Sequence, residues 1–154
     1  MLVALLSTAI VQASVAQEGS KPRQVPQLLA NYYNIKNALV AGNVAQAASA
    51  AAAFVKSANS VDYKLISEGN LQILLRDAGS ISEATDIRKQ REYFVNLSTN
   101  MVALAKTVSL TDRAVYQQYC PMKKAYWLSN EKTIQNPYYG SSMLTCGEIT
   151  NTFE

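Results

Sequence analysis

The segment SISEATDIRKQREYFVNLSTNMVALAKT, residues 80–107, carries the clearest helical pattern in the chain. Ser80 and Glu83 have the spacing of a capping box, which predicts that a helix begins at Ser80. Apolar residues then recur at helical intervals along one face. They are Ala84, Ile87, Phe94, Leu97, Met101, Leu104, Ala105 and Val108. A helix that runs to about Thr107 is ~40 Å long, which is the length of a long bundle helix.

Arg91 interrupts this apolar face. We expect the stem of Arg91 to pack against the core while its guanidinium reaches water or pairs with an acid. An anion-binding site at Arg91 is the alternative interpretation, and no other residue of the segment supports it.

Three shorter helices are expected before this segment. The first covers residues 25–41, where apolar residues recur at helical spacing. The second follows a cap at Asn43 and runs to about Ala58, and its many alanines favour helix and let a neighbour approach closely. The third covers about residues 60–78 and ends at Gly79.

The connections between these helices are short, which favours an up-down four-helix bundle over residues 25–110. After Leu110 the helical periodicity stops, and tyrosines, prolines and the turn sequence NPYYG at 136–140 follow. We therefore predict an all-α fold in which an irregular C-terminal lobe, residues 111–154, packs on the bundle as part of one domain. The lobe is rich in cysteine, methionine and tyrosine, and it has room for a short strand pair.

The first 16 residues carry no charged side chain. The apolar run Leu2–Val11 is shorter than the ~20 residues that cross a bilayer, and Ser14-Val15-Ala16 fits a cleavage site. We therefore predict a signal peptide at 1–16, a disordered lead-in at 17–24, and export to the periplasm or cell surface without a membrane span in the mature chain. An apolar N-terminal helix packed on the core is the alternative, because the segment lacks lysine and arginine.

The composition argues against two broad classes of function. Without histidine, the chain cannot form a Ser-His-Asp or Cys-His catalytic arrangement, and the isolated acids Glu131 and Glu148 are weak candidates for a glycosidase pair. We therefore expect neither an enzyme nor an organic cofactor. The formal charge of +3 is spread without a basic stripe, so nucleic acid is not an expected partner.

Two thiols and two thioethers occur in the C-terminal lobe, as Cys120 and Met122 and as Met143 and Cys146. Thiolate and thioether sulfurs are soft ligands that suit Cu(I), so the four side chains are candidate metal ligands. The rival interpretation is a Cys120–Cys146 disulfide, which would stabilise the fold by ~3 kcal/mol by closing the loop between them. Residue counts alone rank the disulfide first and the metal second.

Aromatic residues surround these sulfurs in the sequence. Five of the nine tyrosines and the single tryptophan lie between residues 116 and 139. The side chains expected to shield a bound ion are Tyr119, Trp127, Tyr138 and Tyr139. Packing of the lobe onto the bundle is the simpler use of these rings, and binding of carbohydrate or peptide is a further alternative.

Three segments of the chain resemble a known family: YYNIKNALVAGNVAQAASAA, RKQREYFVNLSTNMVAL and QYCPMKKAYWLSNEKTIQNPYYGSSMLTCGEI. They are similar to a bacterial domain family of unknown function that occurs as small exported proteins. The domain also occurs fused to periplasmic adaptor subunits of copper/silver (Cus-type) heavy-metal efflux systems. The similarity runs from about Leu28 to Ile149, and the C-terminal run is its most specific part. The spacer Lys123-Lys124 is shorter than in many members.

The resemblance implies a helical domain with a role in heavy-metal handling. Carried onto this sequence, it implies the ligand set Cys120, Met122, Met143 and Cys146, binding Cu(I) or Ag(I). It also implies an efflux adaptor or a metallochaperone as partner. With the resemblance included, metal binding ranks above a structural disulfide. The alternative function is a non-metal structural or protein-interaction domain with a Cys120–Cys146 disulfide.

Overall fold

The computed structural model describes residues 23–154, so the expected signal peptide and most of the expected lead-in lie outside the described residues. Four helices come first: α1 (Gln24–Ala41), α2 (Val44–Ala58), α3 (Glu68–Glu83) and α4 (Ile87–Ala105). The strands β1 (Val115–Cys120), β2 (Ala125–Ser129) and β3 (Glu148–Phe153) follow, with the short 3₁₀ helix η1 (Gly140–Ser142) before β3. Within this part of the chain, no helix combines the length and the apolar character that crossing a membrane requires.

The C-terminal lobe is a three-stranded antiparallel sheet in the order β2-β1-β3, with β1 in the centre. The fold is therefore mixed α and β, and the prediction of an all-α fold with an irregular lobe is wrong. The sequence hides β1 because Gln117 and Gln118 are both buried in the middle of the strand. Their burial removes the alternation of apolar and polar residues that marks a half-exposed strand. The amide nitrogen of Gln118 donates to the carbonyl of Glu131 at 2.9 Å, which helps to offset its burial.

Two of the predicted helices are confirmed almost to the residue. α1 ends where Gly42 adopts a left-handed conformation with φ of 69°. α2 begins after Asn43, whose side-chain oxygen accepts the N–H of Gln46 at 3.0 Å. At both positions a local sequence signal decides the boundary.

The predicted boundary between the third and fourth helices is wrong. Gly79, Ser80 and Glu83 lie inside α3, so Gly79 does not end the helix and the capping-box pair does not begin the next one. Ala78 and Ile81 are buried on the inner face of α3. The burial of these side chains carries the helix past Gly79, which illustrates how tertiary packing overrides local propensity.

α4 begins after Asp86 instead. The Asp86 carboxylate accepts the backbone N–H groups of Arg88 at 2.8 Å and Lys89 at 3.1 Å. These hydrogen bonds, that of Lys89 foremost, lower the pKa of Asp86. A charged carboxylate at this position also interacts favourably with the positive end of the helix dipole.

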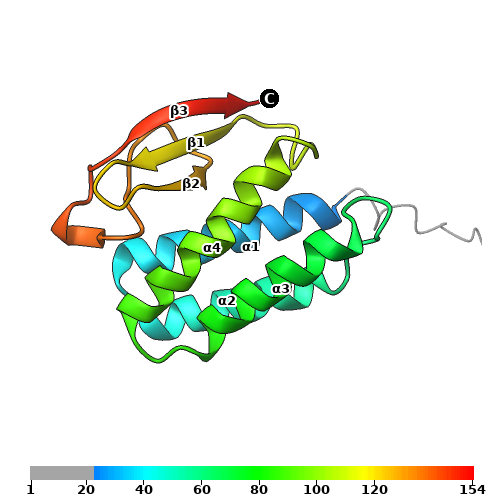
Figure 1. The fold of residues 1–154 in the computed structure, drawn as a ribbon, viewed down its shortest axis with the longest axis horizontal. Coiled ribbons are helices and arrows are strands. Elements are labelled where there is room, and N and C mark those ends of the chain that lie inside the picture. Colours follow the sequence, from blue (N-terminus) through cyan, green and yellow to red (C-terminus); the bar gives the residue numbers. More distant parts are fainter. Residues whose placement is uncertain (1–22) are drawn as a thin grey trace, which may run out of the picture.

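Each helix packs against the next one along the chain, and the sheet lies on α4. Figure 1 shows the sheet on one side of α1 and α4, with α2 and α3 on the other side. A buried aromatic residue, Tyr32 of α1, joins these layers. Its ring stacks on Phe94 of α4 at 5.3 Å, and its hydroxyl lies 2.7 Å from Ser98 and accepts the N–H of Leu128 in β2 at 3.0 Å.

Candidate functional site

The two predicted thiols lie in contact. Cys120 is the last residue of β1 and is completely buried, whereas Cys146 precedes β3 and is partly exposed. Their Sγ atoms are 3.6 Å apart, and both are free cysteines. Tyr119 pairs with Glu148 in the β1–β3 ladder, so the end of β1 meets the start of β3 and carries the two cysteines to the same place. We call Cys120 and Cys146 the thiol pair.

The turn between β1 and β2 directs backbone N–H groups at both sulfurs. The N–H of Lys123 donates to Cys120 Sγ at 3.4 Å, and the N–H of Met122 hydrogen-bonds to the thiol of Cys146. Lys124, at φ of 55°, closes the turn by donating its N–H to the carbonyl of Cys120 at 2.8 Å. Consecutive N–H groups that point to one place favour a negatively charged ligand. The turn is therefore suited to thiolates, free or bound to a metal ion.

The two predicted methionine ligands lie in the turns that flank the thiol pair. Met122 belongs to the β1–β2 turn and its side chain is 64% exposed. Met143 follows η1 and is partly exposed, and its carbonyl accepts the N–H of Cys146 at 3.1 Å. The structure thus brings two of the four predicted ligands into contact and places the other two on the neighbouring surface.

The neighbouring thiol changes the acidity of Cys146. The hydrogen bond with Cys120, together with burial and the charge of Cys120, raises the pKa of Cys146, and the N–H of Met122 lowers it in part. The thiolate is the form that binds metal ions. A metal ion at the thiol pair therefore has to displace protons.

Trp127 lies on the same face of the sheet as Cys120, and Tyr138 packs against Trp127. Trp127 is buried, and the pairing of Cys120 with Ala125 places Trp127 on the same face of the sheet as Cys120. The Tyr138 ring meets the Trp127 ring edge-on at 5.9 Å. Burial, followed by the charges of neighbours that include Cys120, raises the pKa of Tyr138, so its hydroxyl stays protonated.

The other two predicted shielding residues have different positions. The side chain of Tyr119 is on the opposite face of β1 from Cys120, where its ring lies 4.6 Å from that of Tyr126. Tyr139 is partly buried against the hydrophobic core, and its N–H donates to the side chain of Asn136 at 3.3 Å. Tyr119 therefore faces away from Cys120, and Tyr139 stays a predicted shielding residue.

Gly147 allows the close approach of Cys146 to β1 and β2. Its φ is 154°, and a Cβ atom at this position would lie 2.8 Å from the ring of Trp127 and 2.9 Å from the carbonyl oxygen of Tyr119. Both distances are shorter than side chains tolerate. A side chain at residue 147 would therefore push Cys146 away from Cys120.

Asn136 is a site residue that the sequence analysis did not select. It is fully buried, and its amide nitrogen donates to the carbonyl of Cys146 at 2.7 Å. Its side-chain oxygen accepts the N–H of Tyr138 at 2.8 Å, and its own N–H donates to the carbonyl of Leu144 at 2.8 Å. Asn136 thus fixes the loop that carries Cys146. The Asn-Pro dipeptide indicated a turn, but the signal did not show that the amide also reaches forward to residue 146.

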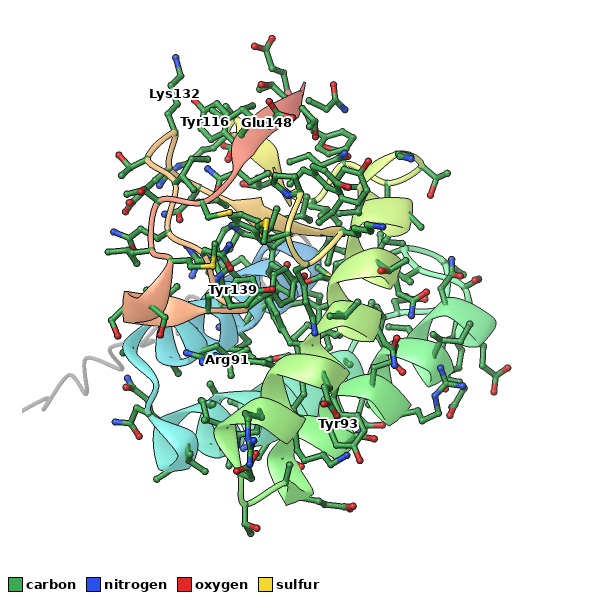
Figure 2. All side chains as sticks on the ribbon, turned by 60° about the vertical axis from the view of Figure 1, so that its left-hand side comes forward. Arg91, Tyr93, Tyr116, Lys132, Tyr139 and Glu148 are labelled. Atoms are coloured by element: carbon green, nitrogen blue, oxygen red, sulfur yellow. The ribbon has the colours of Figure 1, made fainter. Side chains whose placement is uncertain are left out.

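Arg91 lies in the helical half of the molecule, below Tyr139 in Figure 2. Its guanidinium donates to the carbonyl of Leu39 at 2.8 Å, near the carboxyl end of α1, so the protein partner of Arg91 is a backbone oxygen and not an acid. Gly140 passes so close that a Cβ atom there would lie 2.5 Å from Nη2 of Arg91 and 2.8 Å from the carbonyl oxygen of Val40. Arg91 therefore connects α4, α1 and η1, which is a structural role.

On the outer part of the sheet, the Lys132 ammonium lies 5.8 Å from the centre of the Tyr116 ring, and Figure 2 shows these two residues near Glu148.

Within residues 23–154, cysteine, aspartate and glutamate side chains do not gather in any group of three or more that could hold a metal ion.

The comparison with known families concerns the helical half of the chain. The sequence profile of a family described as "Protein of unknown function (DUF3347)" matches residues 28–113. The match begins inside α1, covers α2, α3 and α4, and ends before β1, so the thiol pair lies outside the matched residues. The chain matches no curated protein and no solved structure.

Proposed function

The chain belongs to the DUF3347 family of proteins of unknown function. We propose a function for it that is argued from its own side chains. The chain binds a soft monovalent ion, Cu(I) or Ag(I), at the thiol pair, with Met122 and Met143 as further ligands. The observation that carries the proposal is the 3.6 Å contact between Cys120 Sγ and Cys146 Sγ beneath a turn that donates N–H groups to both. Soft sulfur ligands without imidazole select Cu(I) among the common biological ions.

The distance between the two sulfurs suits a shared ion. With metal–sulfur bonds of ~2.3 Å, sulfurs at this separation enclose an angle of about 100° at the metal. That bent arrangement leaves one side of the ion open for a third or fourth ligand. In this proposal the further ligand is a thioether from the exposed Met122 or from Met143, which lie in the turns beside the thiol pair.

The surroundings of the thiol pair support a metal–thiolate site. Cys120 is excluded from water, and electrostatic interactions are stronger in such a place than in solvent. Met122 is on the surface, where a partner can reach it. A buried ligand at Cys120 and an exposed one at Met122 would suit binding of the ion followed by its transfer to a partner.

The resemblance noted in the sequence supplies the setting for the proposal. A domain similar to those fused to periplasmic adaptors of copper/silver efflux systems is expected in the periplasm or at the cell surface. There it would buffer the ion, or exchange it with an efflux adaptor or a metallochaperone. The role is binding and transfer rather than catalysis.

Titration of the reduced protein with Cu(I) in the presence of a competing Cu(I) chelator tests the proposal. Loss of an outer partner of a metal ligand costs 10–100-fold in affinity, so Cys120→Ser or Cys146→Ser should weaken binding by more than about 100-fold. Met122→Leu or Met143→Leu should weaken binding by a smaller factor. Met101→Leu is the matched control, because Met101 is buried in α4 and its loss should leave the affinity unchanged.

An unchanged Cu(I) affinity in both cysteine variants would remove the thiol pair from the account. If Met101→Leu weakens binding as much as Met122→Leu does, the thioethers act through stability rather than as ligands.

The same contact between the sulfurs favours a second candidate function. A non-metal interaction domain would use Cys120 and Cys146 only as a disulfide that fastens β3 to β1. The mass of the protein before and after reduction distinguishes the two. A bond that persists in mild reductant, in protein that binds no Cu(I) once fully reduced, supports this second candidate.

A further inference from the structure

The two sulfurs of the thiol pair differ in access to solvent. Cys120 has no exposed surface and lies at the end of the central strand, whereas Cys146 is partly exposed in the loop between η1 and β3. A molecule from solution can therefore reach Cys146 and not Cys120. The two sulfurs are nevertheless in contact, so a group that becomes attached to Cys146 Sγ lies next to Cys120 Sγ.

We infer that Cys146 is a modification site at which a small disulfide, such as glutathione disulfide, reacts with the protein, and that Cys120 then completes an internal disulfide. The product holds no free thiol, so it cannot bind the metal ion. The inference rests on the proposed function for its biological consequence, but the exchange chemistry rests on the geometry alone.

The reaction is balanced in two exchanges. In the first, the Cys146 thiolate attacks one sulfur of the small disulfide, whose S–S bond breaks, and one small thiolate leaves and takes up a proton. In the second, the Cys120 thiolate attacks Cys146 Sγ, the mixed disulfide breaks, and the second small thiolate leaves and takes up a proton. The protein loses two protons and two electrons, and the small disulfide is reduced to two thiols.

The structure favours this order of events. The second exchange is intramolecular and begins from sulfurs 3.6 Å apart, which have to approach to the ~2.05 Å of a disulfide bond. The N–H of Lys123 at 3.4 Å from Cys120 Sγ favours the thiolate of the attacking residue. Cys120 is held in β1 by its pairing with Ala125 of β2, and the amide of Asn136 holds the carbonyl of Cys146 at 2.7 Å, so both sulfurs are kept at this short separation before the second exchange.

The test uses the reduced full-length chain, glutathione disulfide as the probe, and acid quenching followed by mass measurement. Cys120→Ser should accumulate one glutathione adduct at Cys146, because the second exchange is blocked. Cys146→Ser should react at least about tenfold more slowly than Cys120→Ser, because the thiol that remains, that of Cys120, is buried. Wild type should end as an internal disulfide with little adduct, and peptide mapping at early times should place the first adduct at Cys146.

Two controls keep this result interpretable. Cys146→Ser unfolded in urea should react readily, which shows that burial protects Cys120 in the native state. The mapping of the wild type needs no substitution, so it stands even if a serine variant folds poorly. Equal rates for the two native variants, or an early wild-type adduct on Cys120, would overturn the inference.

A Cu(I) measurement separates the inference from the proposed function. Wild type loaded with Cu(I) should resist glutathione disulfide, and the oxidised protein should bind Cu(I) only after reduction. If the reduced protein binds no Cu(I) while the first adduct still maps to Cys146, the metal role is wrong and the modification site stands. If the reduced protein binds Cu(I) but Cys120 is modified first, the metal role stands and the inference is wrong.

Discussion

Replacing Tyr32 with Phe tests how the sheet is fastened to the helices. The Tyr32 hydroxyl is fully buried and connects three elements of the fold. It accepts the N–H of Leu128 in β2 at 3.0 Å and lies 2.7 Å from Ser98 Oγ in α4. Tyr32→Phe removes both hydrogen bonds and leaves the ring in place.

The magnitude follows from the groups that lose a partner. A hydrogen bond contributes about 1 kcal/mol net, and a buried N–H left unpaired costs about 1–3 kcal/mol. Leu128 is fully buried, so its N–H has no access to water when the hydroxyl is lost. Ser98 is also fully buried, and its hydroxyl loses the same partner. We therefore expect Tyr32→Phe to lower the free energy of unfolding by about 2–3 kcal/mol.

The neighbouring residue gives a matched control. The hydroxyl of Tyr33 is buried but finds no hydrogen-bond partner among residues 23–154, so Tyr33→Phe should cost nothing or should stabilise slightly. Urea unfolding followed by the emission of Trp127, the only tryptophan, measures both variants. Equal effects of the two variants, or a loss below about 0.5 kcal/mol for Tyr32→Phe, would refute the claim that this hydroxyl joins the layers.

Three further predictions concern charge and the thiol pair. Lys36 is 3% exposed, and burial lowers its pKa while Glu131 partly opposes the shift. Lys36→Met should therefore raise the free energy of unfolding by about 1 kcal/mol at pH 7, whereas Lys124→Met at the surface should not. Because the unfolded chain binds more protons between the lowered pKa and 10.5, this gain should shrink as pH rises through that window, as urea unfolding at several pH values would show. Asn136→Ala should weaken Cu(I) binding by about tenfold through the loss of its hold on Cys146, measured by chelator competition with folding checked by circular dichroism. The Cu(I) affinity should also fall about tenfold per pH unit for each proton displaced as pH decreases, since the pKa of Cys146 is raised by its bond to the neighbouring thiol, and an affinity independent of pH would exclude the thiols as ligands.

The helical half of the fold was predictable where a single local signal decides a boundary. Gly42 and Asn43 mark the junction of α1 and α2 in the sequence and in the structure. The junction of α3 and α4 offered two competing signals, Ser80 with Glu83 and the later Asp86. The choice between them depends on which residues of α3 are buried against its neighbours, and that information is not local.

The sheet and the detailed geometry of the thiol pair could not be predicted for the same reason, although the meeting of Cys120 and Cys146 was expected from the sequence. From its residue type, Gln118 is expected at the surface. In the structure it is buried, and its amide donates to the carbonyl of Glu131. The contact of Cys120 with Cys146 depends on the antiparallel register of β1 with β3, including an irregularity at residues 117 and 118. Spacing in the sequence suggested that the two segments meet, but the register decides which side chains touch.

The two edges of the sheet show why the site depends on the helices although the family match ends before β1. The edge formed by β2 is closed by two hydroxyls, since Tyr32 accepts the N–H of Leu128 and Tyr138 donates to the carbonyl of Tyr126. The opposite edge, β3, is exposed along almost its whole length. β2 is therefore fixed from the helical side, β1 is fixed by pairing with β2, and β3 follows β1. The position of Cys146 beside Cys120 is the last step in this series, so the residues of α1 and α4 that fasten β2 also determine the geometry of the thiol pair.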